Sequence, residues 1–119
     1  MKQERNRVEG YWYNEENKNL PMPIKNILTS KQAQVIYDRL VMIQGHKNTT
    51  RIYYKGSSVS RIDNSILGSG EYKTDKWTWP EGFADHYVLK YHVKPSDEFL
   101  YYIGVELFGG DGHVIENKK

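Results

Sequence analysis

The regular spacing of apolar residues between positions 29 and 45 predicts an amphipathic helix. The apolar side chains recur three or four residues apart, so they share one face of a helix with about 3.6 residues per turn. Thr29 and Gln32 match the pattern of a capping box, and Gly45 stands where helices commonly end. We therefore expect a helix over residues 30–44. Its apolar stripe comprises Ala33, Ile36, Tyr37, Leu40, Val41 and Ile43.

Short runs of β-branched and aromatic residues predict several strands. Such residues suit a pleated, half-buried surface, and each run is bounded by glycine or polar residues. The segment from Ser57 to Gly70 is rich in serine and glycine, and it fits either a long loop or an irregular strand pair. Two apolar runs flank the glycines at 109–112 and predict a hairpin over residues 105–115. The other expected strands are residues 11–13, 50–55, 71–73 and 77–79.

Two further helices are predicted in the C-terminal half. Pro80 suits the first turn of a helix that would continue to about His92. Pro95 suits the first turn of the next helix, which Gly104 would end. Helices and strands come in mixed order without a repeating β-α-β unit. We therefore expect an α+β fold, with a small, mostly antiparallel sheet and about three helices in a single compact domain.

The length and composition limit the class of protein. The 119 residues correspond to one domain, which we expect over residues 10–115, between a flexible N-terminal arm at 1–9 and a polar tail at 116–119. No cysteine is present, which excludes disulfides, thiolate metal sites and cysteine nucleophiles. The N-terminus lacks the apolar region of a signal peptide, and the longest apolar-aromatic run, at 99–105, is too short for a membrane span. We expect a cytoplasmic protein that does not bind membranes.

The near balance of charge argues against a dedicated binder of duplex DNA. The chain carries 17 basic and 15 acidic residues, for a formal net charge of +2. Proteins that bind duplex DNA usually show a clearer basic excess. The abundance of lysine, asparagine, tyrosine and isoleucine indicates an AT-rich coding sequence, which favours a bacterial or phage source.

Familiar catalytic and cofactor-binding motifs are absent. The glycines and serines between positions 56 and 70 match neither a P-loop nor a dinucleotide-binding fingerprint, and no Gly-x-Ser-x-Gly elbow occurs. His86 and His92 are six residues apart, whereas the helical zinc motif places its histidines four apart. The sequence therefore predicts no metal site and no cofactor.

The helix predicted after Pro80 carries the candidates for acid–base chemistry. Glu81, Asp85 and His92 would share one stripe of this helix, and His86 follows Asp85 directly. A carboxylate near a histidine can act as a general acid–base pair. No nucleophile or oxyanion hole accompanies them, so a solvated helix face is the favoured interpretation and a small enzyme is the alternative.

Basic and aromatic residues are interleaved in the middle of the chain. Aromatic rings with lysine or arginine bind single-stranded nucleic acids, and tyrosine, tryptophan and arginine also dominate protein interfaces. The favoured interpretation is that the rings face the core and the charges face water. A protein interface ranks second and a nucleic-acid interface third. The candidate surface comprises Arg51, Tyr53, Lys55, Arg61, Tyr72, Lys73, Trp77 and Trp79.

Together these patterns favour a small, cytoplasmic, non-enzymatic protein-interaction module. Its expected role is that of an accessory, immunity-like or phage-borne protein that binds a partner protein through the basic–aromatic surface. The first alternative is a single-stranded nucleic-acid-binding protein. The second is a small enzyme that uses Glu81, Asp85, His86 and His92.

Overall fold

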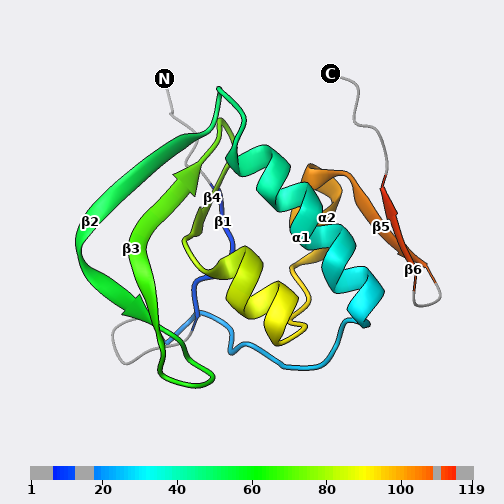
Figure 1. Ribbon diagram of the computed structural model, residues 1–119, viewed down its shortest axis with the longest axis horizontal. Coiled ribbons are helices and arrows are strands. Elements are labelled where there is room, and N and C mark those ends of the chain that lie inside the picture. Colours follow the sequence, from blue (N-terminus) through cyan, green and yellow to red (C-terminus); the bar gives the residue numbers. More distant parts are fainter. Residues whose placement is uncertain (1–6, 13–17, 109–110, 115–119) are drawn as a thin grey trace.

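A four-stranded sheet forms one side of the molecule, with the strand order β1-β4-β3-β2 (Figure 1). In this computed structural model the described residues are 7–12, 18–108 and 111–114. β3 pairs antiparallel with β2 and β4, and the short β1 pairs parallel with β4. The predicted α+β class, with a mostly antiparallel sheet in a single compact domain, is confirmed. The strands of this sheet are β1 (Arg7–Val8), β2 (Thr50–Val59), β3 (Ile66–Lys73) and β4 (Trp77–Pro80).

The β2–β3 hairpin accounts for most of the segment rich in serine and glycine. Of the two interpretations of this segment, the irregular strand pair is confirmed. The pairing register shifts between Tyr53 and Ser58, around Gly56, which has a left-handed φ of 76°. A bulge of this kind bends a strand and interrupts its hydrogen-bond ladder. β2 therefore pairs regularly with β3 only over residues 50–53.

Helix α1 (Ser30–Gln44) begins and ends where its capping signals predict. The Thr29 Oγ1 accepts a hydrogen bond from the Gln32 N–H at 3.1 Å, and the Gln32 Oε1 accepts one from the Thr29 N–H at 2.9 Å. This reciprocal pair is the predicted capping box. The predicted apolar stripe is one residue too wide, because Val41 is 43% exposed. The apolar residues that α1 buries are Ala33, Ile36 and Leu40.

The second predicted helix starts later than expected and has a different geometry. Pro80 ends β4, where it pairs with Glu71, so the prediction that Pro80 begins a helix is wrong. The helix is the π-helix η1 (Phe83–Lys90), in which hydrogen bonds join residues five apart, as from the Tyr91 N–H to the His86 carbonyl at 3.2 Å. Glu81 therefore lies before the helix.

Gly82 makes the sharp turn between β4 and η1. Its φ of 95° lies in the left-handed region that glycine adopts without strain. A Cβ atom at this position would lie 2.9 Å from the Cβ of Leu67, so the turn also needs the absence of a side chain.

The N-cap of helix α2 (Asp97–Ile103) is bound by a residue from the start of the chain. Ser96 is its N-cap, so Pro95 lies outside the helix and its predicted place in the first turn is wrong. The Ser96 N–H and Oγ donate to the two carboxylate oxygens of Glu9, at 2.7 and 2.8 Å. Burial raises the pKa of Glu9, although these hydrogen bonds act in the opposite direction. Gly104 ends the helix as predicted, with a left-handed φ of 82°.

The chain on either side of these elements completes the fold. β5 (Val105–Phe108) and β6 (Asp111–Val114) form the predicted antiparallel hairpin. The predicted glycine turn at 109–112 is wrong for Asp111 and Gly112, which pair with β5, and residues 109, 110 and 115 lie outside the described residues. Residues 7 and 9, within the expected N-terminal arm, donate backbone hydrogen bonds to β4 and its preceding turn, at 3.0 Å each. The strand predicted at residues 11–13 is wrong for Tyr11 and Trp12, which leave the sheet after Gly10, and Tyr13 lies outside the described residues.

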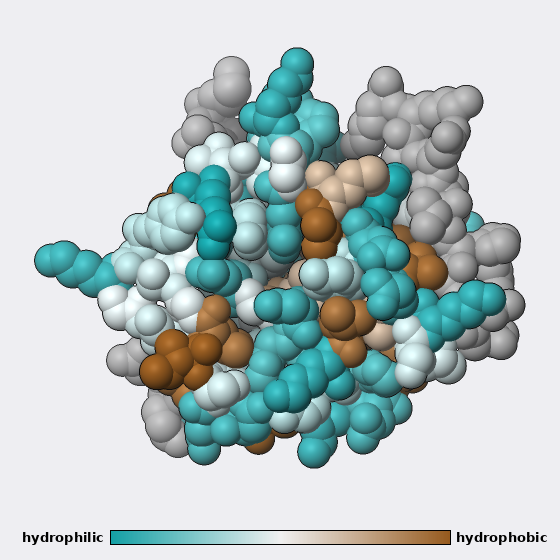
Figure 2. All heavy atoms as spheres, viewed as in Figure 1, coloured by the Kyte–Doolittle hydropathy of each residue, from teal (hydrophilic) through white to brown (hydrophobic). Residues whose placement is uncertain are grey.

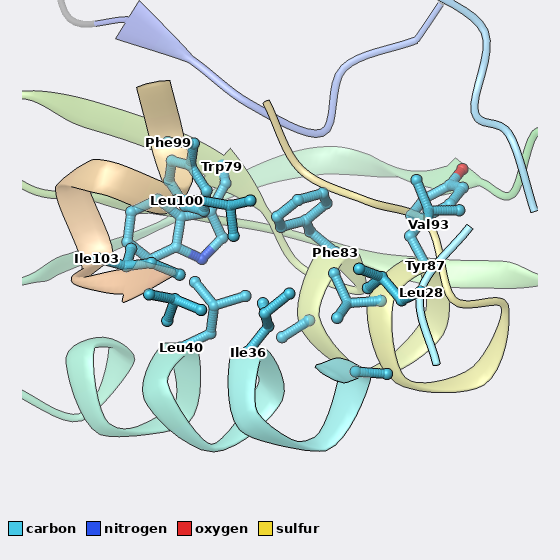
Figure 3. Close-up of a cluster of buried hydrophobic side chains, with 14 of the residues drawn as sticks. Leu28, Ile36, Leu40, Trp79, Phe83, Tyr87, Val93, Phe99, Leu100 and Ile103 are labelled. Carbon is cyan, nitrogen blue, oxygen red and sulfur yellow. The ribbon is translucent and has the colours of Figure 1, made fainter. Parts of the chain in front are cut away.

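Aromatic rings at the centre of the core join the sheet to the helices (Figure 3). Phe99 of α2 is fully buried, and its ring lies edge-on to Trp77, Trp79 and Phe83 at centroid distances of 5.1, 5.4 and 5.8 Å. Edge-to-face contacts of this kind add to the free energy gained by burying apolar area. Side chains from α1, including Ile36 and Leu40, close the opposite side of this cluster.

Removing the Phe99 ring should be among the most damaging single changes in the core. We expect Phe99→Ala to lower the free energy of unfolding by about 3–5 kcal/mol, because it leaves a cavity where three rings meet. The matched control is Tyr101→Ala in the same helix, since Tyr101 is 79% exposed. Urea denaturation followed by circular dichroism measures both. Similar losses for the two variants would contradict the assigned core.

Candidate functional site

Three of the predicted basic–aromatic residues form one cluster on the sheet. The guanidinium carbon of Arg51 lies 4.9 Å from the ring centroid of Tyr53 and 5.2 Å from that of Tyr72. Arg51 and Tyr72 pair across β2 and β3, and Tyr53 is two residues further along β2, so all three side chains lie on one face. We call these three residues and Glu81 the Arg51 cluster.

Glu81 fixes the arginine of this cluster. Its Oε2 accepts a hydrogen bond from the Arg51 Nη2 at 2.9 Å, and its Oε1 accepts one from the Gly70 N–H at 3.1 Å. A Cβ atom on Gly68 or Gly70 would lie 2.4 or 3.1 Å from the same Oε1, so both glycines make room for the carboxylate. The Arg51 side chain remains 39% exposed, so it is held in place while still facing solvent.

The two tryptophans of the predicted surface are core residues. Trp77 is 5% exposed and Trp79 is fully buried, so neither offers a ring to a partner. The Trp79 Nε1–H donates to the Gln44 Oε1 of α1 at 3.0 Å, and the ring stacks on Tyr72 at a centroid distance of 6.1 Å. Trp79 therefore supports the Arg51 cluster from the neighbouring strand, through Tyr72. The alternation of aromatic and polar residues in β4 identified a strand but not which of its faces is covered.

The remaining basic candidates lie apart from the Arg51 cluster. Lys73 follows Tyr72 in β3 and so points to the opposite face of the sheet. Lys55 is exposed in the bulged part of β2, and Arg61 is exposed just beyond its end. None of these three side chains forms an ion pair with a described acidic residue.

The carboxylate of Glu71 lies between two tyrosines, a contact that was not predicted from the sequence. The hydroxyl groups of Tyr11 and Tyr54 both donate to the carboxylate of Glu71. Burial, together with this carboxylate, raises the pKa of Tyr11 well above its usual range. Tyr11 and Glu71 are 60 residues apart in sequence, so no local pattern indicates the contact. These hydrogen bonds hold the chain after β1 against strands β2 and β3.

The predicted stripe of Glu81, Asp85 and His92 does not form, because Glu81 lies before η1 and His92 after it. Glu81 turns to Arg51, whereas His86 turns to the β2–β3 loop. Asp85 accepts a hydrogen bond from the His86 N–H at 3.0 Å, and His92 lies after η1 with a left-handed φ of 59°. No hydrogen bond or ion pair between described residues joins two of these four side chains. The π-helix and its later start displace all of them from the positions expected on an α-helix.

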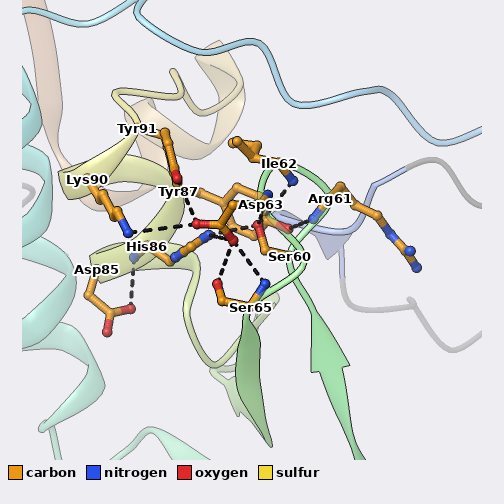
Figure 4. A network of polar contacts seen from close by, with 10 residues as sticks. All are labelled: Ser60, Arg61, Ile62, Asp63, Ser65, Asp85, His86, Tyr87, Lys90 and Tyr91. Carbon is orange, nitrogen blue, oxygen red and sulfur yellow. Dashed lines mark hydrogen bonds and ion pairs between the residues drawn. The ribbon is translucent and has the colours of Figure 1, made fainter.

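A serine, an aspartate and a histidine do meet where η1 faces the β2–β3 loop (Figure 4). The His86 Nε2 lies 2.7 Å from the Ser60 Oγ and 3.4 Å from the Asp63 Oδ1. Asp63 also accepts hydrogen bonds from the Ser65 N–H and hydroxyl at 3.0 and 2.5 Å, and from the Tyr91 hydroxyl at 2.7 Å. These donors, with Ser65 making the largest contribution, hold the pKa of Asp63 well below its usual range.

The arrangement of these three residues is structural rather than catalytic. In a catalytic triad the serine and the aspartate contact different nitrogens of the imidazole ring, whereas here both approach Nε2. Ser60 is fully buried, and its Oγ accepts hydrogen bonds from the Ile62 and Asp63 N–H groups at 3.0 and 3.2 Å. A buried hydroxyl with this many partners has no access to a substrate. The contacts instead fix the loop at residues 60–65 to η1.

An apolar cavity lies on another side of the molecule. It has a volume of about 480 Å³ and lies beside the chain that follows β1. Its walls include the exposed side chains of Met22, Ile24 and Ile27, and Glu9 and Lys94 contribute polar atoms. No residue of the Arg51 cluster lines this cavity, so the two features are separate. The described residues also contain no group of three histidine or acidic side chains that could hold a metal ion.

Exposed apolar residues are dispersed on the face shown in Figure 2. They occur as small groups separated by hydrophilic residues, and one group lies over the end of the β2–β3 hairpin, where Val59 and Ile66 are 40% and 75% exposed. Within residues 7–12, 18–108 and 111–114, no helix combines the length and the hydrophobicity that crossing a bilayer requires. On this face, therefore, a partner would meet a surface in which small apolar groups alternate with hydrophilic residues.

The glycine that makes room for Glu81 can be tested directly. We expect Gly70→Ala to displace the carboxylate, because the new Cβ atom would lie 3.1 Å from its Oε1 and 3.4 Å from the Arg51 Nε. The Arg51 side chain should then become more mobile, which the NMR relaxation of its Nε–H group measures. Gly45→Ala is the control, since Gly45 has an ordinary φ of −88° and a Cβ atom there would come no closer than 3.6 Å to its neighbours. An unchanged Arg51 signal in Gly70→Ala would contradict the assigned contact.

The hydrogen bonds to Asp63 should make the free energy of unfolding depend on pH in the acidic range. The pKa of Asp63 is lower in the folded protein than its ordinary value of 3.8, so its contribution is fully present well above pH 3.8. It is lost progressively as the pH falls below that value towards the folded-state pKa. Asp63→Asn should flatten this part of the pH dependence, and Tyr91→Phe, which removes one donor, should flatten it less. Unfolding free energies measured from pH 7 to pH 2 give the slopes, and equal slopes for wild type and Asp63→Asn would exclude this role.

Comparison of the chain with protein-family models, curated proteins and solved structures finds no match. A function for this protein must therefore be inferred from its own residues and their geometry.

Proposed function

We propose that this protein is a non-enzymatic interaction module that binds a partner protein through the Arg51 cluster. The observation that carries the proposal is the fixed position of the Arg51 guanidinium, between two tyrosine rings and against the Glu81 carboxylate. In keeping with the composition of the chain, we place the module in the cytoplasm as an accessory, immunity-like or phage-borne protein.

The residue types of the Arg51 cluster and their fixed conformations favour a protein partner. Arginine and tyrosine are enriched among the few residues that carry most of the binding free energy at protein interfaces. Tyr53 is 64% exposed and Arg51 is 39% exposed in its side chain, so both can contact another chain. Because Arg51 is already held by Tyr53, Tyr72 and Glu81, binding would immobilise little further rotamer freedom. A lower entropic cost of this kind increases affinity.

The charges around the Arg51 cluster favour a protein over a nucleic acid. Glu81 partly neutralises Arg51, and both Glu81 and Asp85 lie close enough to Tyr72 to raise its pKa, although burial of the ring is the main cause. Binding of a phosphate backbone depends on several basic residues acting together, whereas the Arg51 cluster contains one arginine, which a carboxylate already pairs. A single-stranded nucleic-acid binder remains the alternative, since Lys55 and Arg61 have no acidic partner among the described residues.

The surroundings of the acid–base candidates give an enzymatic function less support. His86 is occupied by Ser60 and Asp63 in a network that fixes a loop, and its side chain is only 10% exposed. Glu81 is occupied by Arg51 and by the Gly70 N–H. General acid–base catalysis needs a group that can reach a substrate proton, and neither side chain is free to do so.

Affinity capture from cells that produce the protein tests the proposal. We expect a stable partner that the tagged wild type retains and that Arg51→Ala and Tyr53→Ala each weaken by at least about fivefold, as truncation of a hot-spot residue does. Tyr101→Ala is the matched control, because Tyr101 is exposed but belongs to α2. Thermal unfolding should show that all variants remain folded.

Two outcomes would contradict the proposal. One is that no protein is retained at native abundance. The other is that a single-stranded oligonucleotide binds at about 50 mM salt with an affinity that falls steeply as salt increases, which indicates counterion release from a phosphate backbone.

A further inference from the structure

Among the described residues, no strand pairs with the outer edge of β2. β2 is the last strand of the sheet, and β3 is its only hydrogen-bonded neighbour among the strands that the structure describes. Every residue of β2 except Ile52 is exposed. An edge strand of this kind presents unpaired N–H and C=O groups, to which another extended chain can add.

Exposed basic residues occur within β2 and on either side of it in the sequence. Lys47 lies just before β2, Lys55 within it and Arg61 just beyond it, and all three are exposed. No described acidic side chain forms an ion pair with any of them. The acidic side chains that approach β2 are already engaged, Glu81 by Arg51 and Glu71 by Tyr54. The edge is therefore complementary in charge to an acidic segment.

We propose that the free edge of β2 accepts an extended, acidic segment of the partner protein as a fifth strand. This inference rests on the proposed function, and it specifies the part of the partner that binds. The added strand would lie along residues 50–53, where β2 is regular, and would end near the bulge at Gly56. Its side chains would alternate between the face of Arg51 and Tyr53 and the face of Ile52 and Tyr54.

The same charges disfavour a second copy of this chain as the added strand. Two β2 edges paired with each other would bring the basic residues Arg51 and Lys55 of both copies to one seam. Like charges on neighbouring strands are destabilising, whereas opposite charges contribute favourably. The bulge at Gly56 also shortens the length over which two copies could pair, because it interrupts the ladder.

The experiment uses the full chain, labelled with ¹⁵N, and short synthetic peptides. The first peptide alternates valine and glutamate over about six residues, a common strand length. The second replaces every glutamate by lysine, and the third keeps the acidic side chains but has proline at its centre. Single-stranded oligothymidylate is the fourth probe. Titrations followed by NMR measure both the affinity and the position of each contact.

We expect the acidic peptide to bind below about 1 mM, with shifts concentrated in residues 50–54 and slower amide exchange on β2. The proline peptide should bind about tenfold more weakly, because it loses a backbone donor and the pairing around it. Lys55→Glu should weaken binding about threefold to tenfold, whereas Lys76→Glu, an exposed lysine before β4, should leave it unchanged.

Three results would overturn the inference. They are equal binding of the acidic and lysine peptides, equal binding of the acidic and proline peptides, and tighter binding of oligothymidylate than of the acidic peptide at the same residues. The experiment also separates the inference from the proposed function. If Arg51→Ala and Tyr53→Ala release a captured protein but no peptide changes the NMR signals of β2, the proposed function is supported and strand addition is wrong. If neither variant releases a protein, the proposed function itself fails.

Discussion

The packing of the β4 tryptophans against Phe99 is the constraint on which the rest of the structure depends. Trp79 and Phe99 are fully buried, and their contact joins the sheet to α2, while the hydrogen bond from Trp79 to Gln44 joins it to α1. β4 is an inner strand, so its ring-bearing face is covered, whereas β2 lies two strands away and is exposed along almost its whole length. The stacked pair of Tyr72 and Trp79 spans the transition between these two regions. The Arg51 cluster is therefore a surface feature built directly on the core, and this explains how its side chains can be both exposed and fixed.

The parts of the fold that could be predicted are those with a local physical cause. The capping box at Thr29 and the glycine at 104 specify helix ends within a few residues of sequence, and both act as expected. Pro80 is ambiguous because proline suits both the first turn of a helix and a strand terminus, and here its pairing with Glu71 decides the outcome. The buried residues of η1 recur four residues apart, which also suits an α-helix, so their spacing does not reveal the π-helical form. The displaced positions of Asp85 and His92 follow from this one difference.

The contacts that define the candidate site could not be predicted, because they join distant parts of the chain. Arg51 and Glu81 are 30 residues apart, and Ser60 and His86 are 26 apart. Composition identified the interleaved basic and aromatic residues, yet only pairing across β2 and β3 shows which of them share a face. A Ser-His-Asp combination would suggest catalysis in a list of residues. Because both side chains approach the same imidazole nitrogen, these contacts instead hold the β2–β3 loop against η1.

The hydrogen bonds between Ser96 and Glu9 also bear on how the chain folds. These residues are separated by 87 positions, and β1 likewise pairs with a strand about seventy residues later. Contacts between distant residues close large loops, and folding slows as such contacts become more prominent. During synthesis β1 leaves the ribosome long before β4 and α2 exist, so its backbone must wait without its native neighbours. The first of the described strands to be made can therefore pair only after β4 has been made, and Glu9 beside it meets its partner only after Ser96 has been made.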